Sequence, residues 1–335
     1  MPALLAFGLA ALLTWRFCHP GSWLHILDEP NERSLHSQAV PRSGGVAVVA
    51  GILAAAAWNA LSGSAGFQPA GVILLGMLPV TLVSFLDDRG GLGAGSRLLV
   101  HLLAALWLLL LGLMPARLPW PGVNWEVPAI VLSSLALLFI VWMINLYNFM
   151  DGMDGFAGGM AVIGFTALAL LGHADPQFSA LCLSVAAAAL GFLLFNFPPA
   201  RIFLGDTGSS SLGLLAAACC LWAERTGLFP LWLGILVFSP FIVDASVTLL
   251  RRLARGERIW QAHRQHAYQR LVAAGWGHRR TVLAEYALML ACAASALAAQ
   301  AAPAAVQQAL LLLWLGFYAA LLLGVEWLTR RGGGA

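Results

Sequence analysis

Lysine is absent from this chain, so all 18 of its Lys and Arg positions are arginines. Charged residues make up only 10% of the 335 residues, against roughly 25% in soluble globular proteins. The mean hydropathy is +0.83, and 60% of the residues are hydrophobic. A soluble globular protein is therefore excluded. We expect an all-α polytopic membrane protein, because long apolar helices satisfy their own backbone hydrogen bonds within a bilayer.

Cysteine is also scarce, and its five positions are odd in number and lack metal-site spacing. All five lie in or at the ends of apolar runs, so we expect small buried hydrophobes: Cys18, Cys182, Cys219, Cys220 and Cys292. The first apolar run, Leu4–Phe17, has no basic region before it and no clear cleavage site after it. It is expected to be a retained span rather than a signal peptide.

Eleven apolar runs are long enough to span a bilayer, or nearly so, within a single membrane domain covering residues 1–335. They are Leu4–Phe17, Val46–Leu61, Pro69–Leu86, Leu98–Met114, Val127–Leu146, Phe156–Leu171, Phe178–Phe197, Gly208–Trp222, Leu228–Leu250, Val282–Ala299 and Val306–Leu328. The ninth run contains Pro240, which predicts a kink. An odd number of spans places the termini on opposite sides of the membrane.

The arginines assign a side to each linker. Sixteen of the 18 follow odd-numbered spans, and the other linkers hold only Arg117 and Arg225. Because positive charge marks cytoplasmic loops, we expect a periplasmic N-terminus and a cytoplasmic C-terminus. The cytoplasmic loops are then approximately residues 18–45, 87–97, 147–155, 198–207 and 251–281.

Carboxylates gather on the same predicted side, beginning with Asp87 and Asp88 in FLDDRGG. A carboxylate at a helix C-terminus is opposed by the helix dipole, so another group must hold the pair there. A divalent cation or a proton-transfer role meets this requirement. The alternative is a solvated turn paired with Arg89.

The stretch NLYNFMDGMDGFAGG joins two of the most apolar runs, yet it carries two asparagines, two aspartates and four glycines. The spacing of three residues places Asn148, Asp151 and Asp154 near one face if the helix continues through them. Such groups can ligate a cation or hold a sugar nucleotide. The alternative is a polar hinge between two spans.

Asp206 lies in a third polar stretch, RIFLGDTGSSS, immediately before an apolar run. Asp206 or Thr207 can cap the following helix. Alternatively, the backbone N–H groups of this helix N-terminus form an anion site suited to phosphate.

Two basic stretches complete the polar side. The first loop holds Arg33, His36 and Arg42, and the last large loop reads HRQHAYQRL. Its two histidines lack the glutamate and the spacing of a helical zinc protease, and a basic cluster of this kind is better matched to a diphosphate. The alternative is that the arginines only set topology and bind lipid headgroups. Asp244, inside the ninth span, is expected to line a cavity or to pair with an arginine.

The combined motifs resemble a known superfamily. Their order is DD, then N-x-x-N-x-x-DG-x-DG, then R-I-F-x-GDTGS, then a histidine motif, from about Asp28 to Leu271. This order is similar to that of the polyprenyl-phosphate N-acetylhexosamine-1-phosphate transferases, which include the phospho-MurNAc-pentapeptide translocase. The resemblance implies transfer of a sugar 1-phosphate from a UDP-sugar to polyprenyl phosphate, with release of UMP and a requirement for Mg²⁺.

The resemblance also implies residue roles. The catalytic residues are expected to be Asp87, Asp88, His263 and His266. The substrate-binding residues are expected to be Asn145, Asn148, Asp154, Arg33, His36, Arg42 and Arg264. The metal ligands are expected to be Asp206 and Asp151, with Mn²⁺ as the alternative ion.

The histidine motif H-R-x-H-x-Y-Q looks like the O-antigen-initiating branch, which implies a UDP-N-acetylhexosamine and undecaprenyl phosphate as substrates. Either Asp87 or Asp88 is expected to deprotonate the lipid phosphate, or else to attack first as a covalent nucleophile. The kinked ninth span is expected to form a wall of the groove that admits the polyprenyl chain.

The competing function is an ion-coupled secondary transporter, since acids within membrane segments also mark carriers. Against it, the acids collect at one face and no inverted repeat is visible. We expect the enzyme in the bacterial inner membrane, in contact with lipid, with its site facing the cytoplasm. A homodimer is an expected assembly, and nucleic acid is not an expected partner.

Overall fold

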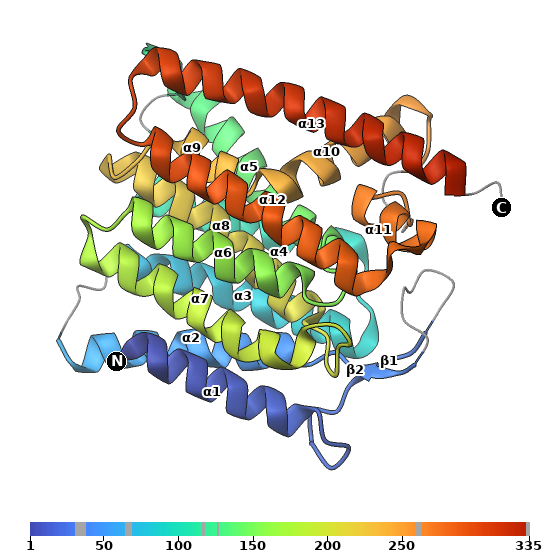
Figure 1. Cartoon of the computed structure of the whole chain (residues 1–335). Coiled ribbons are helices and arrows are strands. Elements are labelled where there is room, and N and C mark those ends of the chain that lie inside the picture. Colours follow the sequence, from blue (N-terminus) through green and yellow to red (C-terminus); the bar gives the residue numbers. More distant parts are fainter. Residues whose placement is uncertain (31–37, 64–68, 116–117, 126, 259–262, 333–335) are drawn as a thin grey trace.

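The computed structural model describes residues 1–30, 38–63, 69–115, 118–125, 127–258 and 263–332, and it is almost entirely helical (Figure 1). The helices are α1 (Pro2–Phe17), α2 (Gly44–Leu61), α3 (Ala70–Gly90), α4 (Ala94–Leu108), η1 (Leu109–Leu113), α5 (Ala129–Phe149), α6 (Phe156–Leu171), α7 (Pro176–Asn196), α8 (Gly205–Thr226), α9 (Leu231–Val237), α10 (Ser239–Ala254), α11 (Ala267–Leu271), η2 (Val272–Trp276), α12 (Gly277–Ala299) and α13 (Ala304–Gly332). Two short antiparallel pairs are β1 (Leu27–Asp28) with β2 (Val40–Pro41) and β3 (Leu118–Trp120) with β4 (Val123–Trp125). The all-α prediction is confirmed.

Most of the long helices lie side by side, and the two chain termini lie at opposite ends of the bundle (Figure 1). By length and apolar character, seven helical segments in the described residues can cross a membrane, or eight if the bent pair α9 and α10 counts as one. Helices α1 and α6, with 16 residues each, are shorter. A multi-pass membrane protein is therefore supported. All eleven predicted segments are helical, while the count of eleven spans and their orientation stay predictions.

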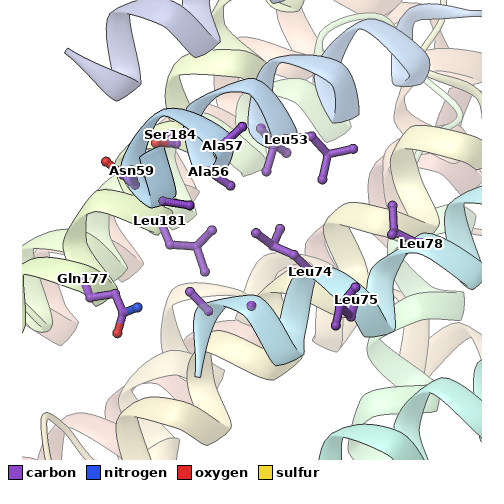
Figure 2. Close-up of a pocket in the computed structure, with 14 residues that line it drawn as sticks. Leu53, Ala56, Ala57, Asn59, Leu74, Leu75, Leu78, Gln177, Leu181 and Ser184 are labelled. Carbon is purple, nitrogen blue, oxygen red and sulfur yellow. The ribbon is translucent and has the colours of Figure 1, made fainter. Parts of the chain in front are cut away.

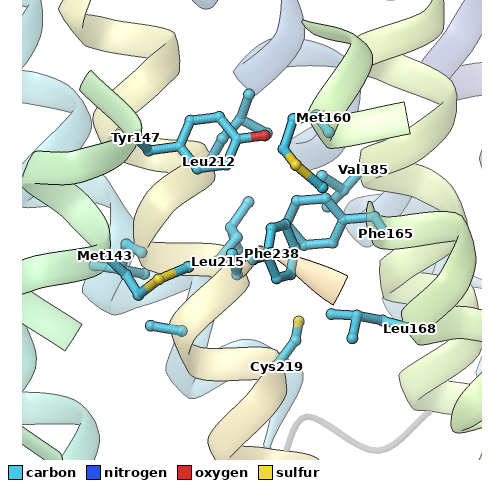
Figure 3. Packing of buried hydrophobic residues seen from close by; sticks show 14 of the residues in the cluster. Met143, Tyr147, Met160, Phe165, Leu168, Val185, Leu212, Leu215, Cys219 and Phe238 are labelled. Carbon is cyan, nitrogen blue, oxygen red and sulfur yellow. The ribbon is translucent and has the colours of Figure 1, made fainter. Parts of the chain in front are cut away.

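The central element is α8, whose residues from Thr207 to Ala223 are all buried. It packs against α5, α3 and α2. Small side chains permit this close packing: a Cβ added to Gly213 would lie 2.4 Å from the carbonyl oxygen of Met143. Figure 3 shows Leu215 and Cys219 of α8 surrounded by side chains from neighbouring helices. Cys219 is buried, as are three of the other cysteines, and Cys18 is partly buried, which agrees with their expected role as small hydrophobes.

The ninth predicted span is broken, as its proline indicated. Helices α9 and α10 meet at an angle of 80°, with Pro240 in the first turn of α10. Proline is tolerated there because that N–H lacks a helical partner in any case. Beside the break lies a cavity of about 660 Å³, whose lining includes Pro240, Asp244, Glu285, Trp314 and Phe317.

A second hollow lies between α2, α3 and α7 and has a volume of about 470 Å³ (Figure 2). Its lining is mostly aliphatic, with Asn59, Gln177 and Ser184 as polar members. These residues come from the C-terminal half of α2 and the N-terminal halves of α3 and α7. The polar motifs lie at the opposite ends of the same helices, so this hollow is separate from the candidate site.

Candidate active site

Asp88 is the carboxylate that caps α8. The backbone N–H groups of Asp206 and Thr207 donate to its two carboxylate oxygens at 3.0 and 2.9 Å, and the Thr207 hydroxyl donates at 2.6 Å. Only 4% of Asp88 is exposed. The predicted anion site at this helix N-terminus is therefore filled by a side chain of α3. The alternative that Asp206 or Thr207 caps the helix is wrong, because both lie within its first turn.

Asp87 and Asp206 share one guanidinium group. Arg97 at the start of α4 lies 2.5 Å from Asp87 Oδ2 and 2.9 Å from Asp206 Oδ2. Asp87 also accepts a hydrogen bond from the backbone N–H of Leu92. The partner expected from adjacency, Arg89, is exposed instead and lies 5.8 Å from the Phe85 ring. The Asp87–Asp88 pair is thus held by α8 and by Arg97.

The first loop is joined to the GDTGS motif by backbone hydrogen bonds. The N–H of Phe203 donates to the carbonyl of Pro41 at 2.7 Å, and the N–H of Gly45 donates to the carbonyl of Leu204 at 2.7 Å. Arg42 donates to the backbone carbonyl of Asp88 and lies 3.6 Å from Asp28. These contacts bring the predicted residue Arg42 to the carboxylates.

Glycine is required where α2 crosses α8. A Cβ on Gly45 would lie 2.2 Å from the backbone nitrogen of Gly208. Real Cβ atoms do not approach a backbone so closely, so the two helices meet only because both positions lack side chains. The predicted residues Arg33 and His36, from the same loop, lie outside the described residues.

The two asparagines of the N-x-x-N motif, Asn145 and Asn148, face different neighbouring helices. Helix α5 ends at Phe149, so Asn148 lies in its last turn, and its amide donates to Ser209 Oγ at 3.1 Å. Asn145 donates to the carbonyl of Val141 at 2.7 Å and lies 3.4 Å from His101 of α4. Both predicted asparagines therefore face the helices that carry Arg97 and Asp206.

Asp151 lies in the loop that follows α5, where the negative charges of neighbouring aspartates act on it. Burial raises the pKa of Asp151 well above its usual range, and the carboxylates of Asp206, Asp88 and Asp28 raise it further. The raised pKa reflects first the burial of this carboxyl and then the negative charge of the neighbouring acids. A cation beside Asp151 would favour its ionised form.

Asp154 turns away from this group. Its carboxylate accepts a hydrogen bond from the N–H of Ala200 at 3.0 Å and lies 3.0 Å from His278 Nδ1 at the start of α12. The expectation that Asn148, Asp151 and Asp154 share one helical face is wrong, because the helix ends before the two aspartates. The predicted role of Asp154 in substrate binding stays a prediction.

The histidine motif forms a neighbouring group on α11 and the segment before it. His263 and His266 have ring centroids 4.9 Å apart, and the His266 ring stacks on Tyr268 at 5.8 Å. Burial, together with His266 and Arg252, lowers the pKa of His263 to about 4, so this ring is neutral at pH 7. The Tyr268 hydroxyl donates to the carbonyl of Phe149 at 3.2 Å, which ties the motif to the end of α5.

Arg264, the remaining predicted substrate-binding residue, is exposed beside His263. The structure adds residues that sequence reasoning missed. Arg97 was counted only as a topology signal, although its place after a glycine-rich turn that follows two aspartates marks it as a possible partner. His101 lies one turn further along the same helix, and His278 contacts Asp154 from α12.

The carboxylates fit a metal ion of the Mg²⁺ class by chemistry. Oxygen donors are what Mg²⁺ prefers, and it commonly binds one or two carboxylates with substrate phosphates and waters. Among the described residues, no group of three or more His, Cys, Asp or Glu side chains forms a ready metal cage. Asp206 and Asp151 are the residues that would hold the ion, because a cation beside them would offset the negative charge of Asp206, which adds to the effect of burial on the pKa of Asp151.

Comparison with known proteins agrees with this arrangement. A model described as "Glycosyl transferase family 4" matches residues 70–224. The probable undecaprenyl-phosphate N-acetylglucosaminyl 1-phosphate transferase of Bacillus subtilis (strain 168) is 32% identical over 78% of this chain and 73% of its own length. The decaprenyl-phosphate N-acetylglucosaminephosphotransferase of Mycobacterium leprae is 31% identical over 84% and 77%.

A phospho-N-acetylmuramoyl-pentapeptide-transferase, from Heliobacterium modesticaldum, is 33% identical over 67% of this chain and 74% of its own length. The three relatives are all named as transferases of a phosphorylated amino sugar. The matched segment includes Asp87, Asp88, the asparagine motif and Asp206. The chain therefore belongs to glycosyl transferase family 4, the polyprenyl-phosphate N-acetylhexosamine-1-phosphate transferases.

Proposed function

We propose that the protein transfers an N-acetylhexosamine 1-phosphate from a UDP-sugar to undecaprenyl phosphate and releases UMP. The observation that carries this proposal is the group of Asp87, Asp88 and Asp206 around Arg97, at the end of the bundle where the first loop and the histidine motif also meet. Two of the relatives are named for N-acetylglucosamine and a polyprenyl phosphate, so these are the first substrates to test. We place the site on the cytoplasmic face of the bacterial inner membrane.

In this proposal Asp87 is the general base and Asp88 is not. Asp88 is only 4% exposed, and its carboxylate accepts three hydrogen bonds from the first turn of α8. Asp87 is bound through Arg97 and Leu92, and 12% of its side chain is exposed. A base must be within reach of the proton that it removes, and the buried cap is not. Asp87 therefore takes the proton from the lipid phosphate.

The bond changes follow from the substrates. An oxygen of the lipid phosphate forms a bond to the sugar-linked phosphorus of the UDP-sugar, and the bond from that phosphorus to the bridging oxygen breaks. UMP leaves with the bridging oxygen. Arg97 and the histidine motif are placed to bind phosphate oxygens, because charge neutralisation is the main catalytic contribution in phosphoryl transfer. When bound, Mg²⁺ would neutralise charge on the diphosphate, and Mn²⁺ would be its substitute.

The cavity beside the break of α9 and α10 is the place that we propose for part of the polyprenyl chain. Its volume is about 660 Å³, and aromatic side chains such as Trp276, Trp314 and Phe317 line it. Burying isoprenoid surface there is favourable in proportion to the apolar area removed from water. The product would enter synthesis of O-antigen or a related cell-envelope polysaccharide.

The test is a transferase assay with purified protein, undecaprenyl phosphate, Mg²⁺ and a panel of UDP-N-acetylhexosamines that includes UDP-GlcNAc. We expect stoichiometric release of UMP and formation of a lipid-linked sugar diphosphate with at least one donor. A reaction without the lipid phosphate is the control. Absence of UMP with every donor, from protein that is folded, would overturn the proposal.

A further inference from the structure

Asp244 of α10 is a buried carboxylate that takes no part in the bond changes proposed above. It lies beyond the 80° bend between α9 and α10 and is only 7% exposed. A carboxylate inside a membrane helix is costly unless other groups bind it. Of the two expectations from sequence, Asp244 does line a cavity, while backbone N–H groups of α11 rather than an arginine contact its carboxylate.

The carboxylate of Asp244 instead holds the first turn of α11. The N–H of Ala267 donates to its Oδ1 at 2.9 Å, and the N–H of Tyr268 donates to its Oδ2 at 3.3 Å. His266 Nδ1 lies 3.4 Å from Oδ1. These are helix-capping interactions supplied by a different helix. They act on the residues of the histidine motif itself.

The orientation of Asp244 is itself set by packing. The Thr248 hydroxyl, one turn along α10, donates to Oδ1 at 3.1 Å. At its other end, α11 is held by Arg270, which lies 3.3 Å from Glu326 and donates to Thr329 at 2.5 Å. The short helix is therefore bound at both ends by the membrane helices α10 and α13.

The same turn leaves Tyr268 with little freedom. Its hydroxyl donates to the carbonyl of Phe149, and a Cβ added to Gly152 would lie 2.3 Å from that hydroxyl. A shift of the turn that Asp244 holds would therefore move Tyr268 against the loop that carries Asp151. A displacement of about 1 Å can cost roughly 10²-fold in rate.

We propose that Asp244 is a positioning residue for the sugar-phosphate transfer, acting through His266. Its Oδ1 lies 3.4 Å from Nδ1 of His266, so the ring turns this nitrogen toward α10, and the other ring nitrogen, Nε2, is the one that we assign to substrate. Its bonds to Ala267 and Tyr268 fix the backbone from which the ring projects. This inference rests on the proposed function, because His266 acts on substrate only in that reaction.

The experiment is a double-mutant cycle of Asp244→Asn and His266→Asn in the full chain. Asparagine keeps the size of the side chain but removes the charge facing the imidazole. Asp175→Asn is the matched control, because Asp175 is also a helix-capping carboxylate, which accepts hydrogen bonds from Gln177 and Phe178 at the start of α7, away from the site. We expect Asp244→Asn to lower kcat about tenfold, and Asp175→Asn to stay within about twofold of the wild type.

In the His266→Asn background, Asp244→Asn is expected to cost less than about twofold, because the group it positions is already gone. The cycle is read from UDP-sugar affinity as well as from kcat, so that a His266→Asn variant without turnover still yields a result. If Asp244→Asn does not fold, Asp244→Glu takes its place in the cycle.

Equal losses in both backgrounds would overturn the inference, as would a loss in Asp175→Asn that matches the loss in Asp244→Asn. Either result would mean that α10 contributes general stability rather than the position of His266. Failure of the wild-type protein to release UMP with any donor would instead count against the proposed function. The wild-type reaction therefore tests the proposed function, and the mutant cycle tests the positioning role of Asp244.

Discussion

Asp87 and Asp88 are adjacent and chemically identical, yet replacing each by asparagine should produce different defects. Asp88→Asn should unfold the N-terminal end of α8, whereas Asp87→Asn should leave the fold intact and abolish transfer. The difference follows from their partners. Asp88 accepts three hydrogen bonds from the first turn of α8, and Asp87 binds the partly exposed Arg97.

The size of the Asp88 effect can be worked from its contacts. An asparagine there presents one NH₂ group to a donor, which leaves a buried N–H or hydroxyl unpaired at a cost of about 1–3 kcal/mol. Loss of the charge at the helix N-terminus costs about 0.3–1 kcal/mol more, or up to ~2 when partly buried. Together these give a loss of roughly 2–4 kcal/mol for Asp88→Asn. Asp87→Asn removes a partly exposed ion pair, worth about 1 kcal/mol or less.

The assay combines unfolding in mixed detergent micelles, followed by tryptophan fluorescence, with UMP release under the same conditions. Thr207→Ala is the graded control, since it removes only the bond at 2.6 Å and should cost about 1 kcal/mol. Asp87→Asn should lower turnover by about 10²-fold or more as a lost general base. The reasoning fails if Asp88→Asn unfolds like the wild type, or if Asp87→Asn is the less stable of the two.

Three further predictions concern the same end of the bundle. Arg97→Ala should lower turnover by about 10²-fold, and Arg97→Lys should be less affected, because a single nitrogen of Arg97, Nη1, contacts both carboxylates and a lysine ammonium keeps that charge; a wild-type kcat in the alanine variant would contradict this. The raised pKa of Asp151 means that the folded protein holds a proton that the unfolded chain loses near pH 4, so metal-free stability should fall as pH rises above about 4. Asp151→Asn should flatten that slope in thermal unfolding between about pH 5 and 8, and an unchanged slope would count against the assignment. Gly45→Ala should cost about 3 kcal/mol or more, because its Cβ would meet the backbone of Gly208 at 2.2 Å, whereas Gly8→Ala, with nothing within 4 Å, should be neutral in the same unfolding measurement.

Much of this architecture could be predicted because it depends on local pattern. Apolar runs bounded by arginine-rich linkers become helices whatever their neighbours are, and the kink at Pro240 follows from the missing N–H. The gathering of Asp87, Asp88, Asn148 and Asp206 also followed from linkers assigned to one side. Topology alone brings such residues to one end of a bundle.

The partners of these residues could not be predicted, because they depend on tertiary packing. Arg97 is ten positions from Asp87 but 109 from Asp206, and its bridging role needs α4 and α8 to be neighbours. The motif that repeats every three residues also does not predict that α5 ends at Phe149. Because the helix ends there, Asp154 contacts His278, and Asp151 lies close enough to Asp206, Asp88 and Asp28 for their charges to affect its pKa.

The paired aspartates show how one helix end provides two different carboxylates. Consecutive residues on a helix are separated by about 100°, so neighbours in sequence face different surroundings. At the end of α3, one direction meets the N-terminus of α8 and the other meets Arg97 of α4. Asp88 therefore contributes to the fold that carries Asp206, and Asp87 contributes a carboxylate that shares its cation with Asp206. Neither can replace the other, since each depends on a direction that only its own position provides.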